Sequence, residues 1–275
     1  MEFDMRSRVQ LMFLAAAFLL ALIISPQVHA QQNLFNVPSG VITKPGELFF
    51  QEQFNFARPA GSSNTTFDYG LGNGWEVGVN VLDVLFYQDV GNPPPTGPQQ
   101  VNPDVLFNLQ KGFEVTDSWK VGLGGQFGFN PARQPGDIKF LNYSWVINEF
   151  DFPEHEELGK WYAGGYYSTL PYRGSGETVG LLLGSEIPVI EDKLSFQWDW
   201  TTGRNDIGVA VIGGVYTFES NWQLSLGAQL PSPGTQNPYG VVIEFTCPGA
   251  KLPLRGQHSR GRSGRGFGLP RMGLW

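Results

Sequence analysis

The most regular feature of the chain is an alternation of apolar and polar residues over short stretches. Residues 119–129 give the clearest case, with one face formed by Trp119, Val121, Leu123, Gly125, Phe127 and Phe129. Successive side chains of a strand point to opposite faces, so this alternation indicates a strand with one apolar side. The pattern recurs between turn-forming segments and predicts twelve strands, at residues 47–56, 65–72, 75–85, 104–110, 119–129, 138–148, 160–170, 178–188, 194–201, 207–218, 222–230 and 238–245.

Turn residues followed by tryptophan open several of these strands. Asn73-Gly74 is the dipeptide expected in a two-residue hairpin turn. Trp75, Trp119, Trp161 and Trp222 each begin an odd-numbered predicted strand, so a meander would place all four at one end. Tryptophan favours the membrane–water interface, and we expect these four side chains to lie there. A soluble β-sandwich, the alternative fold, gives no reason for this placement.

The last predicted strand carries a recognisable pattern. Tyr239, Val241, Ile243 and Phe245 share one face and end in an aromatic residue. This pattern resembles the closing strand of Gram-negative outer-membrane β-barrels. The resemblance implies an all-β fold, a transmembrane antiparallel up-and-down β-barrel of about twelve strands. It also implies that the barrel-assembly machinery recognises these four residues, and that outer-membrane lipid and lipopolysaccharide surround the protein.

The ends of the chain differ from the barrel pattern. Arg6 and Arg8 precede 14 apolar residues and the small-residue motif Val28-His29-Ala30, which predicts a secretory signal peptide over residues 1–30. A span needs about 20 residues, so a membrane anchor is disfavoured. We expect residues 31–46 to be a periplasmic lead-in and not a plug, and residues 47–245 to form the barrel. Residues 246–275, with one lysine, five arginines and no acid, read as a disordered basic tail, either a genuine extension or a read-through or frame-shifted end. We expect no nucleic-acid partner.

Charge changes the picture of the interior. Residues 31–245 contain 10 Lys and Arg against 23 Asp and Glu. The polar strand faces carry Asp68, Glu76, Asp104, Glu186, Asp199 and Glu244 against Lys120 alone. Charges on the lipid face are costly, so we expect these groups in the lumen, where they would attract cations. The alternative is that they pair with Lys120 and Lys139 in a packed, nonconducting interior.

Candidate chemistry is sparse. A barrel lipase would need a serine beside a histidine, and the three histidines, His29, His155 and His258, lie in the signal peptide, a turn and the tail. The acidic residues around His155 read as a solvated turn, so we expect no catalytic residue, metal or cofactor. Residues 69–76, Tyr-Gly-Leu-Gly-Asn-Gly-Trp-Glu, resemble a stretch in the small barrels linked to aromatic-compound (meta-pathway) degradation, which implies an uptake pore. Two functions stay open: a passive channel for small neutral or cationic solutes, and a structural barrel with a filled lumen.

Overall fold

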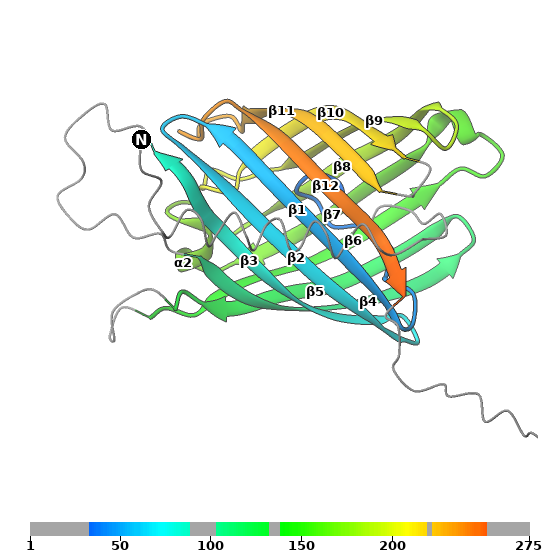
Figure 1. Cartoon of the computed structure of the whole chain (residues 1–275), viewed down its shortest axis with the longest axis horizontal. Helices are drawn as coiled ribbons and strands as arrows, with labels where there is room; N and C mark the ends of the chain where they lie inside the picture. Colours follow the sequence, from blue (N-terminus) through cyan, green and yellow to red (C-terminus); the bar gives the residue numbers. More distant parts are fainter. Residues whose placement is uncertain (1–32, 89–102, 132–137, 219–221, 252–275) are drawn as a thin grey trace, which may run out of the picture.

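A computed structural model describes residues 33–88, 103–131, 138–218 and 222–251 of the chain. Twelve antiparallel strands close into a barrel within these residues, which confirms the predicted architecture (Figure 1). The strands are β1 (Glu47–Ala57), β2 (Ala60–Gly72), β3 (Trp75–Gln88), β4 (Asp104–Thr116), β5 (Trp119–Phe129), β6 (Leu141–Asp151), β7 (Lys160–Ser168), β8 (Val179–Ile190), β9 (Leu194–Thr201), β10 (Val209–Thr217), β11 (Gln223–Pro231) and β12 (Gly240–Lys251). The predicted signal peptide and residues 252–275 lie outside the described residues.

Within the part of the chain that the structure describes, helix is confined to two short pieces in the connections. A 3-10 turn, η1 (Glu156–Leu158), lies between β6 and β7, and a single helical turn, α2 (Leu170–Arg173), lies between β7 and β8. Neither piece, nor any other helix of the described residues, has the length and apolar character needed to cross a membrane.

The connections define two ends of the barrel. The turn end carries residues 73–74, 117–118, 152–159 and 191–193, and the loop end carries residues 58–59, 130–131, 138–140, 169–178, 202–208 and 232–239. Asn73 and Gly74 both have positive φ, which confirms the predicted hairpin turn. The β1–β2 connection is shorter than expected, because β2 begins at Ala60 and not at residue 65. Its first residues, Ala60 to Thr66, carry no large apolar side chain, so alternation could not reveal them.

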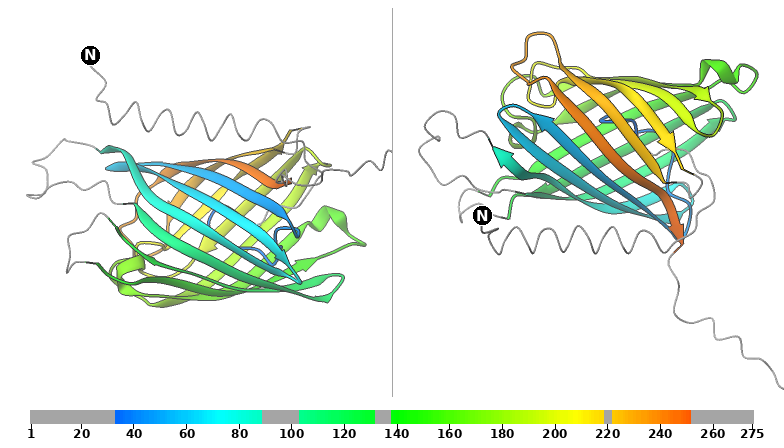
Figure 2. Two further views of the ribbon diagram at one scale, coloured as in Figure 1. Left: turned by 60° about the horizontal axis from the view of Figure 1, so that its bottom comes forward. Right: turned by 45° about the horizontal axis from the view of Figure 1, so that its top comes forward.

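The closing strand is longer than the sequence predicted. β12 pairs with β1 beyond Phe245, with Phe50 opposite Cys247 and Leu48 opposite Ala250, and the blue and orange strands lie side by side in both views of Figure 2. The prediction that the barrel ends at Phe245 and the tail begins at residue 246 is therefore wrong for residues 246–251. The physical reason is that β1 starts at Glu47, and its first residues need partners on β12 to satisfy their backbone groups.

The wall has an apolar outer face and a polar inner face, as a membrane barrel requires. Large apolar side chains such as Phe107, Leu123 and Leu181 are exposed on the outside. Trp75, Trp119 and Trp161 are exposed at the starts of β3, β5 and β7, and Trp222 immediately precedes β11. All four tryptophans thus lie at the turn end, while their role at a membrane interface stays a prediction.

Residues 33–43 lie inside the barrel, and the exposed residues 44–46 lead from them into β1. Leu34, Phe35 and Val37 are fully buried, and the segment bonds to inward-facing residues of β1, β3, β4, β6 and β9, which only a chain inside the lumen can reach together. The expectation of a lead-in that is not a plug is therefore corrected for these residues. Their polar, proline-containing sequence forms no strand of its own, and its burial depends on distant partners that the local pattern does not show.

Candidate functional site

Three wall carboxylates hold the internal segment. Asp199 of β9 accepts hydrogen bonds from the backbone N–H groups of Asn36 and Val37, the latter at 2.9 Å. Glu149 of β6 accepts one from the Gly40 N–H at 3.0 Å. Glu76 of β3 accepts bonds from both the backbone N–H and the hydroxyl of Thr43, each at 2.9 Å. Backbone N–H groups that would otherwise be buried without partners are satisfied in this way.

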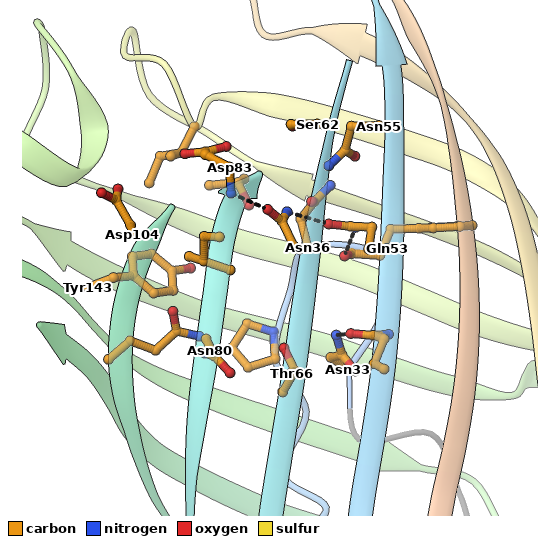
Figure 3. Close-up of a pocket in the computed structure, with 18 of the residues that line it drawn as sticks. Asn33, Asn36, Gln53, Asn55, Ser62, Thr66, Asn80, Asp83, Asp104 and Tyr143 are labelled. Carbon is orange, nitrogen blue, oxygen red and sulfur yellow. Dashed lines mark hydrogen bonds between the residues drawn. The ribbon is translucent and has the colours of Figure 1, made fainter. Parts of the chain in front are cut away.

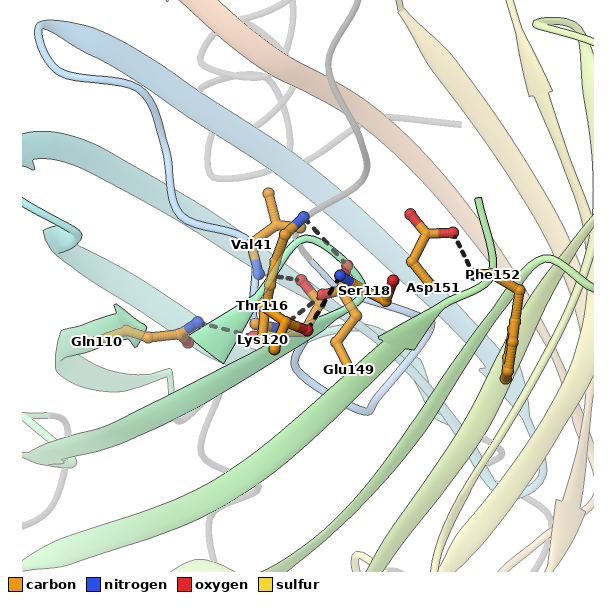
Figure 4. A network of polar contacts seen from close by, with 10 residues as sticks. Val41, Gln110, Thr116, Ser118, Lys120, Glu149, Asp151 and Phe152 are labelled. Atoms are coloured by element: carbon orange, nitrogen blue, oxygen red, sulfur yellow. Dashed lines mark hydrogen bonds and ion pairs between the residues drawn. The ribbon is translucent and has the colours of Figure 1, made fainter. Parts of the chain in front are cut away.

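Neutral and basic side chains complete the anchoring. Gln53 Nε2 donates to the Phe35 carbonyl at 2.8 Å, and Gln110 Nε2 donates to the Ser39 carbonyl at 2.8 Å. Lys120 Nζ lies 3.7 Å from the Glu149 carboxylate, and Figure 4 shows this pair beside the segment. The segment is therefore bonded to opposite sides of the wall.

The segment separates two cavities. The loop-end cavity has a volume of about 460 Å³ and is bordered by Asn33, Phe35, Asn36 and Pro38 of the segment. The turn-end cavity, of about 490 Å³, is bordered by residues 40–45 together with the Asn73-Gly74 turn and Lys120. The described residues of the segment thus border one cavity toward each end of the lumen.

Side-chain amides are the most numerous polar groups that line the loop-end cavity, and several of them point into the space shown in Figure 3. They are Asn33, Asn36, Gln51, Gln53, Asn55, Asn64, Asn80, Asn108, Gln110, Gln126, Gln229 and Asn237. Five carboxylates join them: Asp68, Glu76, Asp83, Asp104 and Asp206. None of the described residues that line this cavity is lysine, arginine or histidine.

Aromatic side chains fill the opposite part of the lumen. Tyr143, Trp145, Tyr162 and Tyr166 from β6 and β7 form a buried cluster with Ile147, Leu182 and, from the internal segment, Leu34 and Val37. The Tyr143 and Tyr172 rings stack at 5.4 Å with an interplanar angle of 12°. The interior is therefore asymmetric, with a packed side at β6 to β8 and an amide-lined side at β1 to β5.

The structure brings most of the sequence-predicted charges to the inner face, where they have partners. Asp68 accepts a bond from Asn108, Asp104 from Asn130, Glu186 from Ser195 and Glu244 from Gln53. Glu76, Asp199 and Lys120 belong to the anchoring of the internal segment. The interior acids therefore do not form a row of free charges, and several hold the protein chain itself.

The sequence-predicted lumen site contains only charged residues, so it includes neither the amides nor Glu149. The amides alternate with apolar residues on the same strands, as Asn108 and Gln110 do in β4, so the alternation that located Asp68 could also have located them. Glu149 lies just beyond the predicted strand 138–148, whereas β6 runs to Asp151.

A salt bridge connects two loops at the loop end. Arg204 Nη2 lies 3.0 Å from Glu177 Oε1, and the Arg204 backbone N–H donates to Glu177 Oε2 at 2.9 Å. These hydrogen bonds, the backbone one first, lower the pKa of the Glu177 carboxyl below its usual value. Across the described residues, no group of three or more His, Cys, Asp or Glu side chains could hold a metal ion.

Comparison with known proteins places the fold. No protein-family model and no curated protein sequence matches the chain. Among solved structures, the NanC porin aligns with 11% identity and a TM-score of 0.51, over 74% of this chain and 100% of that one. The KdgM porin aligns with 8% identity, a TM-score of 0.49, and coverage of 72% and 97%. An outer membrane channel from Pseudomonas putida F1 aligns with 9% identity, a TM-score of 0.46, and coverage of 80% and 99%. The similarity to NanC shows that the chain has the twelve-stranded fold of an outer-membrane porin.

Proposed function

We propose that the protein is a channel of the bacterial outer membrane for the passive passage of small neutral or cationic solutes. The observation that carries this proposal is a closed barrel with an apolar outer face and a polar, cavity-containing lumen. Such a barrel satisfies all its backbone groups in lipid while keeping its interior wet. The proposal involves no chemical reaction and no cofactor.

The predicted surroundings follow from the same proposal. Three points stay predictions: that residues 1–30 direct export, that the barrel contacts lipopolysaccharide, and that the barrel-assembly machinery inserts the protein. The residues expected to be recognised by that machinery are Tyr239, Val241, Ile243 and Phe245. We place the turn end in the periplasm, because bacterial barrels have short periplasmic turns. The resemblance to the aromatic-degradation barrels also stays a prediction.

A structural barrel with a nonconducting lumen is the second candidate. The observation that favours it is the internal segment, which is bonded to both sides of the wall and lies between the two cavities. Transport then requires either a path beside the segment or its displacement.

Single-channel recording in planar bilayers tests the proposal. We expect stepwise ionic currents from the reconstituted protein, and a smaller conductance for Asn80→Trp, which fills part of the loop-end cavity. Phe107→Trp is the matched control, because Phe107 is exposed on the outer face of the barrel. Absence of any current from protein that shifts on heating in an SDS gel, as folded barrels do, would favour the structural barrel.

A further inference from the structure

The inner wall carries a transverse row of polar side chains at one level of the loop-end cavity. The strand register aligns Asp68 of β2 with Gly78, Gly78 with Asn108 of β4, Asn108 with Gln126 of β5, and Gln126 with Tyr143 of β6. Neighbouring strands lie about 4.8 Å apart. The row therefore presents four hydrogen-bonding side chains at one level across β2 to β6, with Gly78 of β3 as the single gap.

Several polar atoms along this wall have no partner within the described chain. They are the acceptors Asn80 Oδ1, Asn108 Oδ1 and Gln126 Oε1, and the donor Trp145 Nε1. Asn80, Asn108 and Trp145 are 1%, 8% and 6% exposed and line the cavity. A buried polar group without a partner destabilises the folded protein, because it has lost its hydrogen bonds to water. These atoms would be satisfied by a guest that both donates and accepts hydrogen bonds.

The aromatic side of the cavity adds a second requirement. Tyr143, Trp145 and Tyr172 line it as adjoining rings, with Tyr143 5.4 Å from each of the other two. Flat aromatic faces favour contact with C–H groups. A pocket that combines aromatic surface with a few placed polar groups is typical of small-molecule sites, and its volume lies in their usual range.

The charge of the cavity lining limits the class of solute that could bind. The lining includes five carboxylates and no described basic side chain, so an anionic solute would be repelled. A cation such as an ammonium group has only donors, and it would leave the Trp145 N–H without an acceptor. Hydroxyl groups both donate and accept. We propose that the loop-end cavity binds a neutral polyhydroxylated solute, a sugar or polyol; this rests on the proposed channel function and specifies its substrate class.

Calorimetric titration of the detergent-solubilised protein with four probes tests this assignment. The probes are glucose, its anionic relative gluconate, the cation propylammonium, which has no hydroxyl group, and the aromatic phenol, which has a single hydroxyl group. We expect glucose to bind most tightly, and Gln126→Leu and Asn80→Leu each to weaken its binding about fivefold, the effect of one lost hydrogen bond. Gln223→Leu is the matched control, because Gln223 is a buried amide outside this cavity.

The outcomes separate the two proposals. The assignment is overturned if phenol, gluconate or propylammonium binds more tightly than glucose, or if the two cavity variants bind glucose as the control does. If the variants do not fold, the ranking of the four probes on the unaltered protein still decides. Uptake of glucose into liposomes is measured in parallel: uptake without binding refutes the site and keeps the channel, whereas binding without uptake of any solute refutes the channel and keeps the site.

Discussion

A glycine on β3 lets the Asp68 carboxylate of β2 reach across that strand to β4. Asp68 on β2 bonds to Asn108 on β4 at 2.9 Å, although β3 lies between them. Gly78 is the β3 residue in between, and a Cβ there would clash with the Asp68 carboxylate and the Phe67 carbonyl. Glycine at this position is therefore a requirement of the polar row and not only of strand curvature.

Gly78→Ala should consequently destabilise the barrel. The methyl group meets backbone as well as side chain, so we expect a loss of about 1–3 kcal/mol, as for other overpacked interiors. The urea midpoint of unfolding in lipid vesicles measures it. Gly214→Ala is the control, because the nearest atom to its added Cβ is the Ser195 carbonyl oxygen at 3.5 Å. Equal midpoints for the two variants would contradict the argument.

The Glu177–Arg204 pair makes a pH-dependent contribution at the loop end. The pKa of the Glu177 carboxyl is lowered in the folded protein. The pair therefore stabilises the loops at pH values above the ordinary pKa of a glutamate, and this stabilisation is lost as the pH falls through the lowered pKa. We expect an NMR titration of the Glu177 side chain to give a pKa that rises in Arg204→Gln. The remaining backbone bond from residue 204 makes this rise partial. An unchanged pKa would show that the guanidinium contributes nothing.

Single residues were predictable where alternation alone decides their face. Asp68, Glu76, Asp199 and Glu244 lie inside because their neighbours are apolar and lie outside. Glu52 broke the pattern, since it falls on the apolar face of β1, and the structure explains it by a 2.5 Å hydrogen bond from the Thr65 hydroxyl of β2. That partner is set by strand register, which the sequence does not state.

At the level of elements, the internal segment controls the continuity of the lumen. Deleting residues 33–43 removes the part that bonds to Asp199, Glu149 and Glu76. We expect the two cavities to join and the single-channel conductance to rise. A truncation after Lys251 is the control, because it removes no described residue of the lumen. A conductance equal to that of the full chain would mean that the path of ions avoids the segment.

The end of β12 gives a second test at this scale. Truncation after Phe245 removes the partners of residues 47–51 of β1, including the Thr246 hydroxyl that accepts a bond from Gln51. We expect this variant to unfold at a lower temperature in SDS gels than the chain truncated after Lys251, because its seam has unpaired backbone groups. If both truncated chains unfolded at the same temperature in the gels, residues 246–251 would be unnecessary for stability and the strand would functionally end at Phe245.

Elements were predictable when they carried their own periodicity. The cross-strand partners of β5 match the predicted run of 119–129, and the twelve strands close as counted. The start of β2 lacks large apolar residues, and the internal segment shows no periodic alternation of apolar and polar residues, so neither could be predicted from the pattern. The position of the internal segment comes from carboxylates on β3, β6 and β9, which are far away in the sequence.

At the scale of the whole molecule, the lumen has a distinct electrostatic layout. The inner acids Asp199 and Glu76 are bonded to the internal segment, so they contribute less to ion selection than the sequence alone suggested. Asp83 and Asp206 are exposed and line the loop-end cavity, where ions would enter. Lys44 and Lys120 line the turn-end cavity. The expected selectivity filter is therefore acidic and lies at the loop end.

This layout predicts a weak preference for cations. Exposed carboxylates at a narrow, low-dielectric mouth raise the local cation concentration, and salt screens them over about 10 Å at 0.1 M. Under a potassium chloride gradient we expect a reversal potential whose sign shows that potassium permeates more readily than chloride. We expect this potential to be larger in dilute than in concentrated salt. Asp83→Asn combined with Asp206→Asn should reduce it, and asparagine tolerates the positive φ of residue 83.

Asp192→Asn is the matched control for that measurement. Asp192 is an exposed acid with a similar positive φ, but it lies in the 191–193 turn at the opposite end of the barrel. Its loss should leave the reversal potential unchanged if the loop-end acids select the ions. Chloride preference in the unaltered protein would refute the electrostatic argument. An equal reduction in both variants would instead assign selectivity to the overall negative charge of the barrel.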